Sequence, residues 1–360
     1  MTRPPDGPDA WAELRGALAR VLRAEGGPPA PGGEPVEGWV DRLVTSAVRG
    51  GIAGRRAAAD RPHHAAAGKL VVIVGGAGAM GRAMAPRFGR AGCAVRVVEE
   101  PDWADGSAPA ALAAADAAVL SVPIDKAEAV ARRTGPALRD DAVLADVTSV
   151  KRPALAAMLD AHAGPVVGLH PMFGPGLETW LAQKIVVCPG RRSDEGAWLV
   201  GALAAEGAKV VEMTAEAHDR AMVAVQALRH LHTMAFGAVL ERTGLDLADT
   251  LRVASPIYRL ELGMVSRLFA QDAGLYARII TGGPDRRAAA GEMARAVAEL
   301  CALAERGDVA GLEAVFARVR SALGDEVERA ADETGAVVEA LTAKIAAETH
   351  HSDRPAPKRS

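Results

Sequence analysis

The sequence predicts an α/β protein in which a doubly wound parallel sheet is followed by an all-α domain. Two observations predict this architecture. Between residues 69 and 214, short runs rich in Val, Ile and Ala alternate with segments of helical period, which is the pattern of parallel strands joined by crossover helices. From residue 215 to about residue 348, the pattern is helical almost throughout.

The expected strands are short apolar runs, typical of strands that are buried on both faces. They cover residues 69–76, 94–100, 116–124, 141–149, 165–174, 184–190 and 208–214. The expected helices between them cover residues 78–92, 125–138, 150–163 and 195–207. In the all-α part, TGGPDRR at 281–287 interrupts the helical pattern, and GDVAGLEAV at 307–315 starts another helix.

The two ends of the chain are expected to lie outside this architecture. Short amphipathic helices are predicted at 11–22 and 36–48, separated by GGPPAPGGEP, which no helix crosses. The long Ala- and Leu-rich helices of the second domain need a partner surface, so we expect a homodimer. The expected parts are an N-terminal extension at 1–66, a sheet domain at 67–213, a helical domain at 214–348 and a flexible tail at 349–360.

Composition and charge argue against several classes of function. Lys and Arg total 42 against 45 Asp and Glu, a net charge of −3, so we expect neither nucleic acid nor a membrane as partner. No window approaches the roughly 18 uninterrupted apolar residues of a membrane span, and no signal peptide is recognisable. Cys93, Cys188 and Cys301 include no CxxC pair, so neither disulfides nor a metal site is expected. We expect a cytoplasmic protein with a small-molecule ligand.

The segment GAGAMG at 76–81 fits the GxGxxG pattern of dinucleotide-binding loops. It follows an expected strand directly and opens an expected helix, which is the context that makes this pattern specific. The glycines would allow a tight turn, the approach of a pyrophosphate and close helix packing, while the helix N-terminus supplies N–H donors. The competing interpretation is a glycine-rich turn that binds nothing. The residues expected to bind a cofactor here are Gly76, Gly78, Ala79, Met80 and Gly81.

Glu99 ends the next expected strand, close to the spacing of about 20 residues at which an acid binds the ribose hydroxyls. A carboxylate there repels the 2′-phosphate of NADP, so NAD is the expected cofactor. Arg96 would point to the opposite face of the strand. Together with the glycine motif, Glu99 predicts a sheet domain of the Rossmann type.

From about residue 69 to residue 335, roughly three-quarters of its length, the chain closely resembles a known family. The matching stretches are VVIVGGAGAMGR, VRVVEEPDW, VLSVPI, DVTSVKRPALAAML, PVVGLHPMFGP, QALRHLHTMAFG and SPIYRLELGMVSRLFAQD. They resemble the dehydrogenase part of the bifunctional chorismate mutase/prephenate dehydrogenases. The resemblance implies oxidation of prephenate by NAD with loss of carbon dioxide, which gives 4-hydroxyphenylpyruvate for tyrosine biosynthesis.

The resemblance also implies roles for residues of the sheet domain. His170, in GLHPMFGP, is implied to be the catalytic base on the substrate C4 hydroxyl, and Ser149, in DVTSVK, to lie near that hydroxyl. Ser149 could instead cap the helix that starts near Val150. Lys151 is implied to bind substrate, with a first-turn surface lysine as the alternative. In VLSVPI, the residues implied to bind the cofactor are Ser121 and Pro123.

In the helical domain, Arg267 and Arg259 share one helix face two turns apart. Arg267 matches the arginine that binds the ring carboxylate in this family, and Arg259 matches one that binds substrate or joins the domains. Their apolar neighbours predict a mostly buried helix. His230 and Tyr276 match residues near the substrate, although each could serve only in packing; weaker candidates are His218 and Arg229.

Two departures from the family pattern keep other functions open. The N-terminal extension is at most a remnant of a mutase domain, so mutase activity is not expected. The loop after His170 continues with GLET at 176–179, where relatives carry acidic and hydroxyl residues. The chain could therefore be a 4-amino-4-deoxyprephenate dehydrogenase, which forms 4-aminophenylpyruvate for specialised metabolism. A second alternative is an inactive, NAD-binding regulatory homologue.

Overall fold

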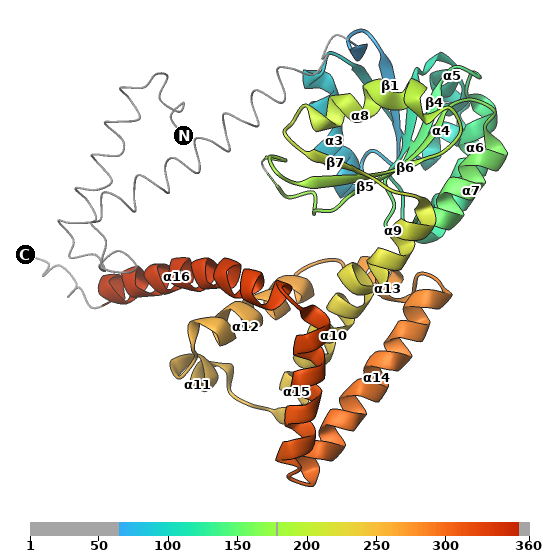
Figure 1. Cartoon of the computed structure of the whole chain (residues 1–360). Helices are drawn as coiled ribbons and strands as arrows, with labels where there is room; N and C mark the ends of the chain where they lie inside the picture. Colours follow the sequence, from blue (N-terminus) through green and yellow to red (C-terminus); the bar gives the residue numbers. More distant parts are fainter. Residues whose placement is uncertain (1–64, 178, 353–360) are drawn as a thin grey trace, which may run out of the picture. The chain divides into compact units, whose positions relative to one another are not determined.

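Figure 1 shows the computed structural model of the chain, in which residues 65–177 and 179–352 are described. The helices predicted at 11–22 and 36–48 lie outside the described residues. Two compact units divide between His218 and Asp219. We call the described residues up to His218 the sheet unit and those from Asp219 onward the helical unit.

The sheet unit contains a seven-stranded sheet in the order β2-β1-β3-β4-β5-β6-β7. Each strand forms where an apolar run is predicted. The inner strands are buried on both faces, which needs apolar side chains at nearly every position, whereas the edge strands β2 and β7 are largely exposed. The strands are β1 (Leu70–Val74), β2 (Ala94–Val98), β3 (Ala117–Leu120), β4 (Val143–Asp146), β5 (Val166–Pro171), β6 (Lys184–Pro189) and β7 (Lys209–Glu212).

One pairing in this sheet departs from the prediction of a parallel sheet. Strands β1 to β5 run parallel, and β7 runs parallel to β6, but β5 pairs with β6 in the antiparallel sense. Only the loop 172–183 joins these two strands, and none of its described residues is helical. A parallel partner would need a crossover of about a dozen or more residues, usually with a helix, so the chain turns back instead.

Helices cover both faces of the sheet (Figure 1), which confirms the doubly wound arrangement. On β1, Val71 and Ile73 face one helix layer, and Val72 and Val74 face the other, as the alternation along a strand requires. The first layer contains α3 (Ala79–Arg90) and α8 (Ala197–Ala204); the second contains α5 (Ser107–Ala114), α6 (Ala127–Thr134) and α7 (Lys151–Ala161). Helices α4 (Glu100–Ala104) and α5 are additional to the predicted elements.

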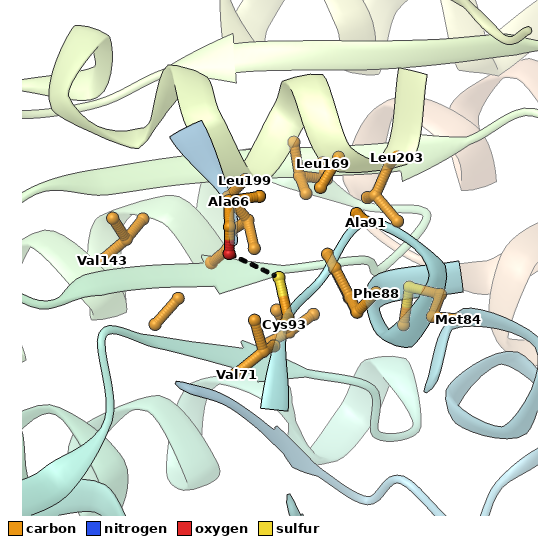
Figure 2. Close-up of a cluster of buried hydrophobic side chains, with 14 of the residues drawn as sticks. Ala66, Val71, Met84, Phe88, Ala91, Cys93, Val143, Leu169, Leu199 and Leu203 are labelled. Atoms are coloured by element: carbon orange, nitrogen blue, oxygen red, sulfur yellow. Dashed lines mark hydrogen bonds between the residues drawn. The ribbon is translucent and has the colours of Figure 1, made fainter. Parts of the chain in front are cut away.

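The layer on the α3 side anchors the helix that follows the glycine motif. Figure 2 shows Met84 and Phe88 of α3 among the buried side chains of this layer, which include Leu199 and Leu203 of α8. Cys93 is also buried in this cluster, and its Sγ donates to the carbonyl oxygen of Ala66 at 3.3 Å. Burial of large side chains such as these contributes about 1.5–3 kcal/mol each, so α3 is held firmly against β1.

The helical unit begins inside α9 and contains no strand among its described residues. Polar side chains cap its helices where the sequence offers them: Ser255, Asp272 and Asp308 each accept a hydrogen bond from a first-turn N–H. The predicted break falls between α13 and α14. The elements are α9 (Ala215–Met222), a π-helical turn η6 (Val223–Leu228), α10 (Arg229–Thr243), α11 (Leu247–Arg252), α12 (Pro256–Phe269), α13 (Ala273–Thr281), α14 (Pro284–Glu305), α15 (Val309–Leu323) and α16 (Glu326–Ser352).

The prediction that α12 is mostly buried is wrong for the single chain. Leu262, Val265 and Leu268 are buried, but Ile257 is 65% exposed and Met264 is 38% exposed. One face of α12 packs against α10 and α16, and its remaining apolar side chains are left at the surface. None of the described helices is both long and apolar enough to cross a membrane.

Candidate active site

The glycine loop makes its turn one residue earlier than predicted. Gly75, rather than Gly76, has a positive φ of 77°, a conformation that only glycine adopts readily. A Cβ at Gly75 would lie 2.6 Å from the carbonyl oxygen of Ser121 at the end of β3. The loop therefore lies between the ends of β1 and β3, where the strand order reverses and open α/β sheets bind ligands.

Gly81 has the packing role that the sequence predicts for it. A Cβ at Gly81 would lie 2.5 Å from the Cα of Gly76, so the first turn of α3 can approach the loop only without a side chain there. No side-chain hydrogen bond caps the start of α3 at Gly78. An uncapped helix N-terminus behind a glycine loop fits the phosphates of a dinucleotide.

Glu99 lies at the end of β2, beside the glycine loop. Its Oε1 accepts a hydrogen bond from the backbone N–H of Ala77 at 2.6 Å. Its own N–H donates to Asp102 Oδ2 at 2.7 Å. Ser121 is half-buried and Pro123 is exposed, both just beyond β3. The predicted cofactor residues thus follow β1, β2 and β3 at the same edge of the sheet.

His170 lies near the carboxyl end of β5 and is paired with a second histidine. Its Nδ1 lies 2.8 Å from Nε2 of His218, and the two rings meet edge to face. Both are buried, with 3% and 0% of their surface exposed. One of the two facing nitrogens must donate and the other accept, so the two tautomers are coupled. The sequence offered little signal for this pairing, because the partner lies 48 residues away in α9.

Lys151 is not the surface lysine of the alternative interpretation, because its side chain is fully buried. Its Nζ donates to Asp146 Oδ2 at 2.5 Å and to the carbonyl oxygen of Leu169 at 2.6 Å. The side chain passes Gly168 of β5, where a Cβ would lie 3.3 Å from Lys151 Cδ. A buried ion pair thus joins the ends of β4 and β5 immediately before His170.

Ser149 is half-buried in the turn between β4 and α7. The capping alternative is wrong: the N-cap of α7 is Val150, and no side chain accepts a capping hydrogen bond there. Since β4 and β5 are parallel neighbours, Ser149, just after β4, and His170, near the end of β5, lie at the same edge of the sheet.

The helical unit holds its own cluster of predicted residues. The rings of His230 and Tyr276 meet edge to face at 4.7 Å, and Tyr276 Oη donates to Gln271 Oε1 at 3.0 Å. Nearby, Arg286 is buried and donates to the carbonyl oxygen of Ile279 at 2.7 Å. Burial and the charges of Arg229 and Arg286 lower the pKa of His230 to about 4. His230 is therefore neutral near pH 7.

The free energy of unfolding is expected to fall on acidification because of His230. An unfolded histidine has a pKa of about 6.5, so between about pH 6.5 and pH 4 the unfolded chain binds the extra proton and is favoured. Chemical denaturation at pH 7 and pH 4.5 should show a loss of up to about 3 kcal/mol that His230→Gln largely removes. The exposed His232 provides the control His232→Gln, which should keep the loss; an unchanged pH dependence in His230→Gln would contradict this.

Arg267 and Arg259 lie on α12, and both are exposed in the single chain. The structure thus places the predicted residues in two groups. The sheet unit holds His170, Ser149, Lys151 and the cofactor residues, and the helical unit holds Arg267, Arg259, His230 and Tyr276.

Two family models match consecutive parts of the chain. Residues 99–212 match "Prephenate dehydrogenase, nucleotide-binding domain". Residues 214–318 match "Prephenate dehydrogenase, dimerization domain". The first match covers β3 to β7, and the second covers the helices from α9 into α15.

Several known proteins are similar to the chain. The T-protein of Enterobacter agglomerans is 41% identical over 259 residues, which cover 72% of this chain and 69% of that protein. The 4-amino-4-deoxyprephenate dehydrogenase of Streptomyces pristinaespiralis is 34% identical over 299 residues, which cover 78% of this chain and 97% of that protein.

Among solved structures, the prephenate dehydrogenase of A. aeolicus in complex with hydroxyphenyl propionate and NAD+ has the same fold. Its TM-score is 0.54 at 19% identity, over 71% of this chain and 97% of that one. The family matches, the identity to the T-protein and the shared fold agree, and the chain belongs to the prephenate dehydrogenase family.

Proposed function

We propose that the chain catalyses the NAD-dependent oxidative decarboxylation of prephenate to 4-hydroxyphenylpyruvate, a step of tyrosine biosynthesis. The observation that carries this proposal is the buried pair of His170 and His218 at the ligand-binding edge of the sheet, in a chain of this family. A general base must present a neutral ring nitrogen within reach of the proton that it takes. The contact with His218 orients the buried His170 ring and couples the tautomers of the two histidines.

His170 performs the proton transfer in this reaction. With its Nδ1–H donating to His218 Nε2, the lone pair of His170 Nε2 can accept the proton of the C4 hydroxyl. Bound NAD would supply the acceptor for the hydride that leaves C4. The ring carboxylate leaves as carbon dioxide, its bonding electrons enter the ring, and aromatisation drives the reaction. The C4 oxygen, a phenolate at this point, takes its proton back from His170, which regenerates the base. Ser149, at the same edge of the sheet, is proposed to hydrogen-bond the reacting hydroxyl.

NAD is proposed to bind at the glycine loop. Gly76, Gly78 and Gly81 with the N–H groups of Ala79 and Met80 would receive the pyrophosphate, and Glu99 the ribose hydroxyls. The bond from Ala77 N–H holds the Glu99 carboxylate at this loop, where it would repel a 2′-phosphate. Ser121 and Pro123 would complete the site beyond β3.

Arg267 is proposed to bind the ring carboxylate, with Arg259, His230 and Tyr276 as further substrate residues. Lys151 was predicted to bind substrate as well, but its buried Nζ donates to Asp146 and Leu169, so it is proposed to hold the end of β5 next to His170 instead. Arg267→Ala should raise the KM for substrate about 10- to 100-fold, because a hydrogen-bonded charge pair contributes about 1.5–3 kcal/mol. Initial rates at saturating NAD measure this. Arg252→Ala, at an exposed arginine of α11, should leave the KM unchanged. An unchanged KM in Arg267→Ala would refute the carboxylate role.

The 4-amino analogue of prephenate is the second candidate substrate. The Streptomyces pristinaespiralis dehydrogenase is matched over 97% of its length, compared with 69% for the T-protein. Both candidate substrates carry the same carboxylates, so the arginines cannot distinguish them.

The deciding experiment compares NADH formation from prephenate and from 4-amino-4-deoxyprephenate by the purified protein. A higher kcat/KM on prephenate would support the proposal. A higher kcat/KM on the amino compound would show instead that the chain is a 4-amino-4-deoxyprephenate dehydrogenase. Activity on neither would favour an inactive regulatory homologue.

We also infer that the chain is a homodimer through its helical domain. Apolar side chains are exposed on α12 and α15, with Ile257 65%, Val309 65% and Phe316 74% exposed. Large apolar side chains that are exposed in this way on helices are typical of a protein–protein interface. Phe316→Asp should give a monomer in light scattering after size-exclusion chromatography, while the neighbouring control Ala317→Asp stays dimeric. A dimeric Phe316→Asp protein would place the interface elsewhere.

A further inference from the structure

A buried arginine, Arg87, lies in the last turns of α3. It is only 7% exposed, which is rare for an arginine that lacks specific partners. Its guanidinium carbon lies 4.3 Å from the centroid of the Trp180 indole, which is fully buried itself. The two side chains stack although strands β2 to β5 lie between them in the sequence.

The same guanidinium holds the backbone of the loop that contains Trp180. Its Nη2 donates to the carbonyl oxygen of Leu177 at 3.2 Å, and its Nη1 donates to Ala83 within α3 at 2.5 Å. Its Nε lies 3.7 Å from Glu206 Oε2. Desolvation lowers the pKa of Arg87 and the Glu206 charge opposes this. Arg87 therefore connects the cofactor helix to the loop 172–183 by stacking and by a hydrogen bond.

The loop 172–183 is the segment that directly follows the proposed base on β5. Its two ends are fixed by backbone hydrogen bonds, from Met172 N–H to Lys184 at 2.9 Å and from Gln183 N–H to Trp180 at 3.0 Å. The Phe173 ring packs against Trp180 at 4.8 Å. The exposed residues 174–176 lie between the Phe173 and Leu177 anchors. The position of this exposed part depends on anchors that Arg87 holds.

We propose that Arg87 is a positioning residue for substrate binding: by stacking on Trp180 and bonding Leu177, it fixes the loop after His170 on the cofactor helix before substrate arrives. This inference rests on the proposed function. A planar guanidinium can stack face to face on the indole while its N–H groups donate at its edge; a lysine ammonium has no planar face to stack, and an apolar side chain has no donor. The loop is then preorganised, so substrate binding does not include the entropic cost of ordering it.

The test compares Arg87→Met with Arg90→Met. Arg90 lies on the same helix and also pairs with Glu206, but its side chain is 56% exposed. Arg87→Met should raise the KM for the preferred substrate about tenfold, which corresponds to about 1.4 kcal/mol, with kcat and the KM for NAD changed less than about twofold. Hydrogen exchange of the peptide 172–183 should become faster. Arg90→Met should change none of these values.

An unchanged KM together with unchanged hydrogen exchange in Arg87→Met would overturn the inference. If Arg87→Met does not fold, Trp180→Leu removes the stacking surface and keeps an apolar side chain, and it should give the same two changes. Normal values in that variant would overturn the inference equally. If the wild-type protein turns over neither substrate, the proposed function fails, but hydrogen exchange still decides whether Arg87 holds the loop.

Discussion

Replacing His170 with Asn is expected to lower kcat about 10²- to 10⁴-fold, the usual contribution of a general base. Asparagine retains a polar side chain of similar reach toward His218, so the 2.8 Å contact between the two histidines is replaced with little loss of packing. It has no lone pair basic enough to accept the C4 hydroxyl proton. Stopped-flow or steady-state NADH formation measures the loss.

The affinity for NAD should stay the same in His170→Asn, because the glycine loop follows β1 and His170 lies on β5. The dissociation constant of the dinucleotide, measured by titrating the protein with NADH and following its fluorescence, with NAD as competitor, checks this. The exposed His232 of α10 provides the matched control, and His232→Asn should retain full turnover. Turnover within about threefold of wild type in His170→Asn, against the usual 10² or more for a base, would refute the assignment.

Replacing Lys151 with Met is expected to cost about 3–5 kcal/mol of unfolding free energy, because it leaves the Asp146 charge buried without its partner. Both side chains are fully buried at 2.5 Å, so water cannot replace the lost ammonium. The loss also frees the carbonyl of Leu169, next to the proposed base. Urea denaturation monitored by circular dichroism measures the change.

A second substitution separates the buried charge from other effects of Lys151→Met. Asp146→Asn in the same chain removes the remaining charge and keeps an acceptor for the Thr148 N–H, which donates to Asp146 at 3.0 Å. The double variant should recover much of the lost stability. Lys209→Met, at an exposed lysine of β7, should cost little. A loss below about 1 kcal/mol in Lys151→Met, the range of exposed pairs, would contradict the buried ion pair.

The elements of the fold could be predicted because their causes are local. The apolar runs at 70–74 and 166–171 form strands, and the caps at Ser255, Asp272 and Asp308 start helices through hydrogen bonds to residues two or three positions away. The glycine motif is local for the same reason, since the loop contacts its own strand and helix. Its turn residue was misplaced by one position, because spacing does not show which glycine adopts a positive φ.

The arrangement of the candidate site was decided by contacts between residues far apart in the chain. From the sequence alone, Lys151 would be a polar residue in the first turn of a helix. Its burial depends on β5, which packs over the side chain, and on Gly168, which has no side chain to occupy the same space. The pairing of His170 with His218 and the stacking of Arg87 on Trp180 likewise cannot be predicted from the residues next to each of them in the sequence.

The sequence by itself thus determined the strands, most of the helices between them, the glycine loop and the family, because backbone hydrogen bonding and apolar periodicity act over a few residues. The tertiary structure decided the antiparallel return of β6, the exposed apolar face of α12 and the partners of Arg87, Lys151 and His170. The physical reason is that burial and charge pairing depend on which distant segments the packed sheet brings within a few ångströms of each other.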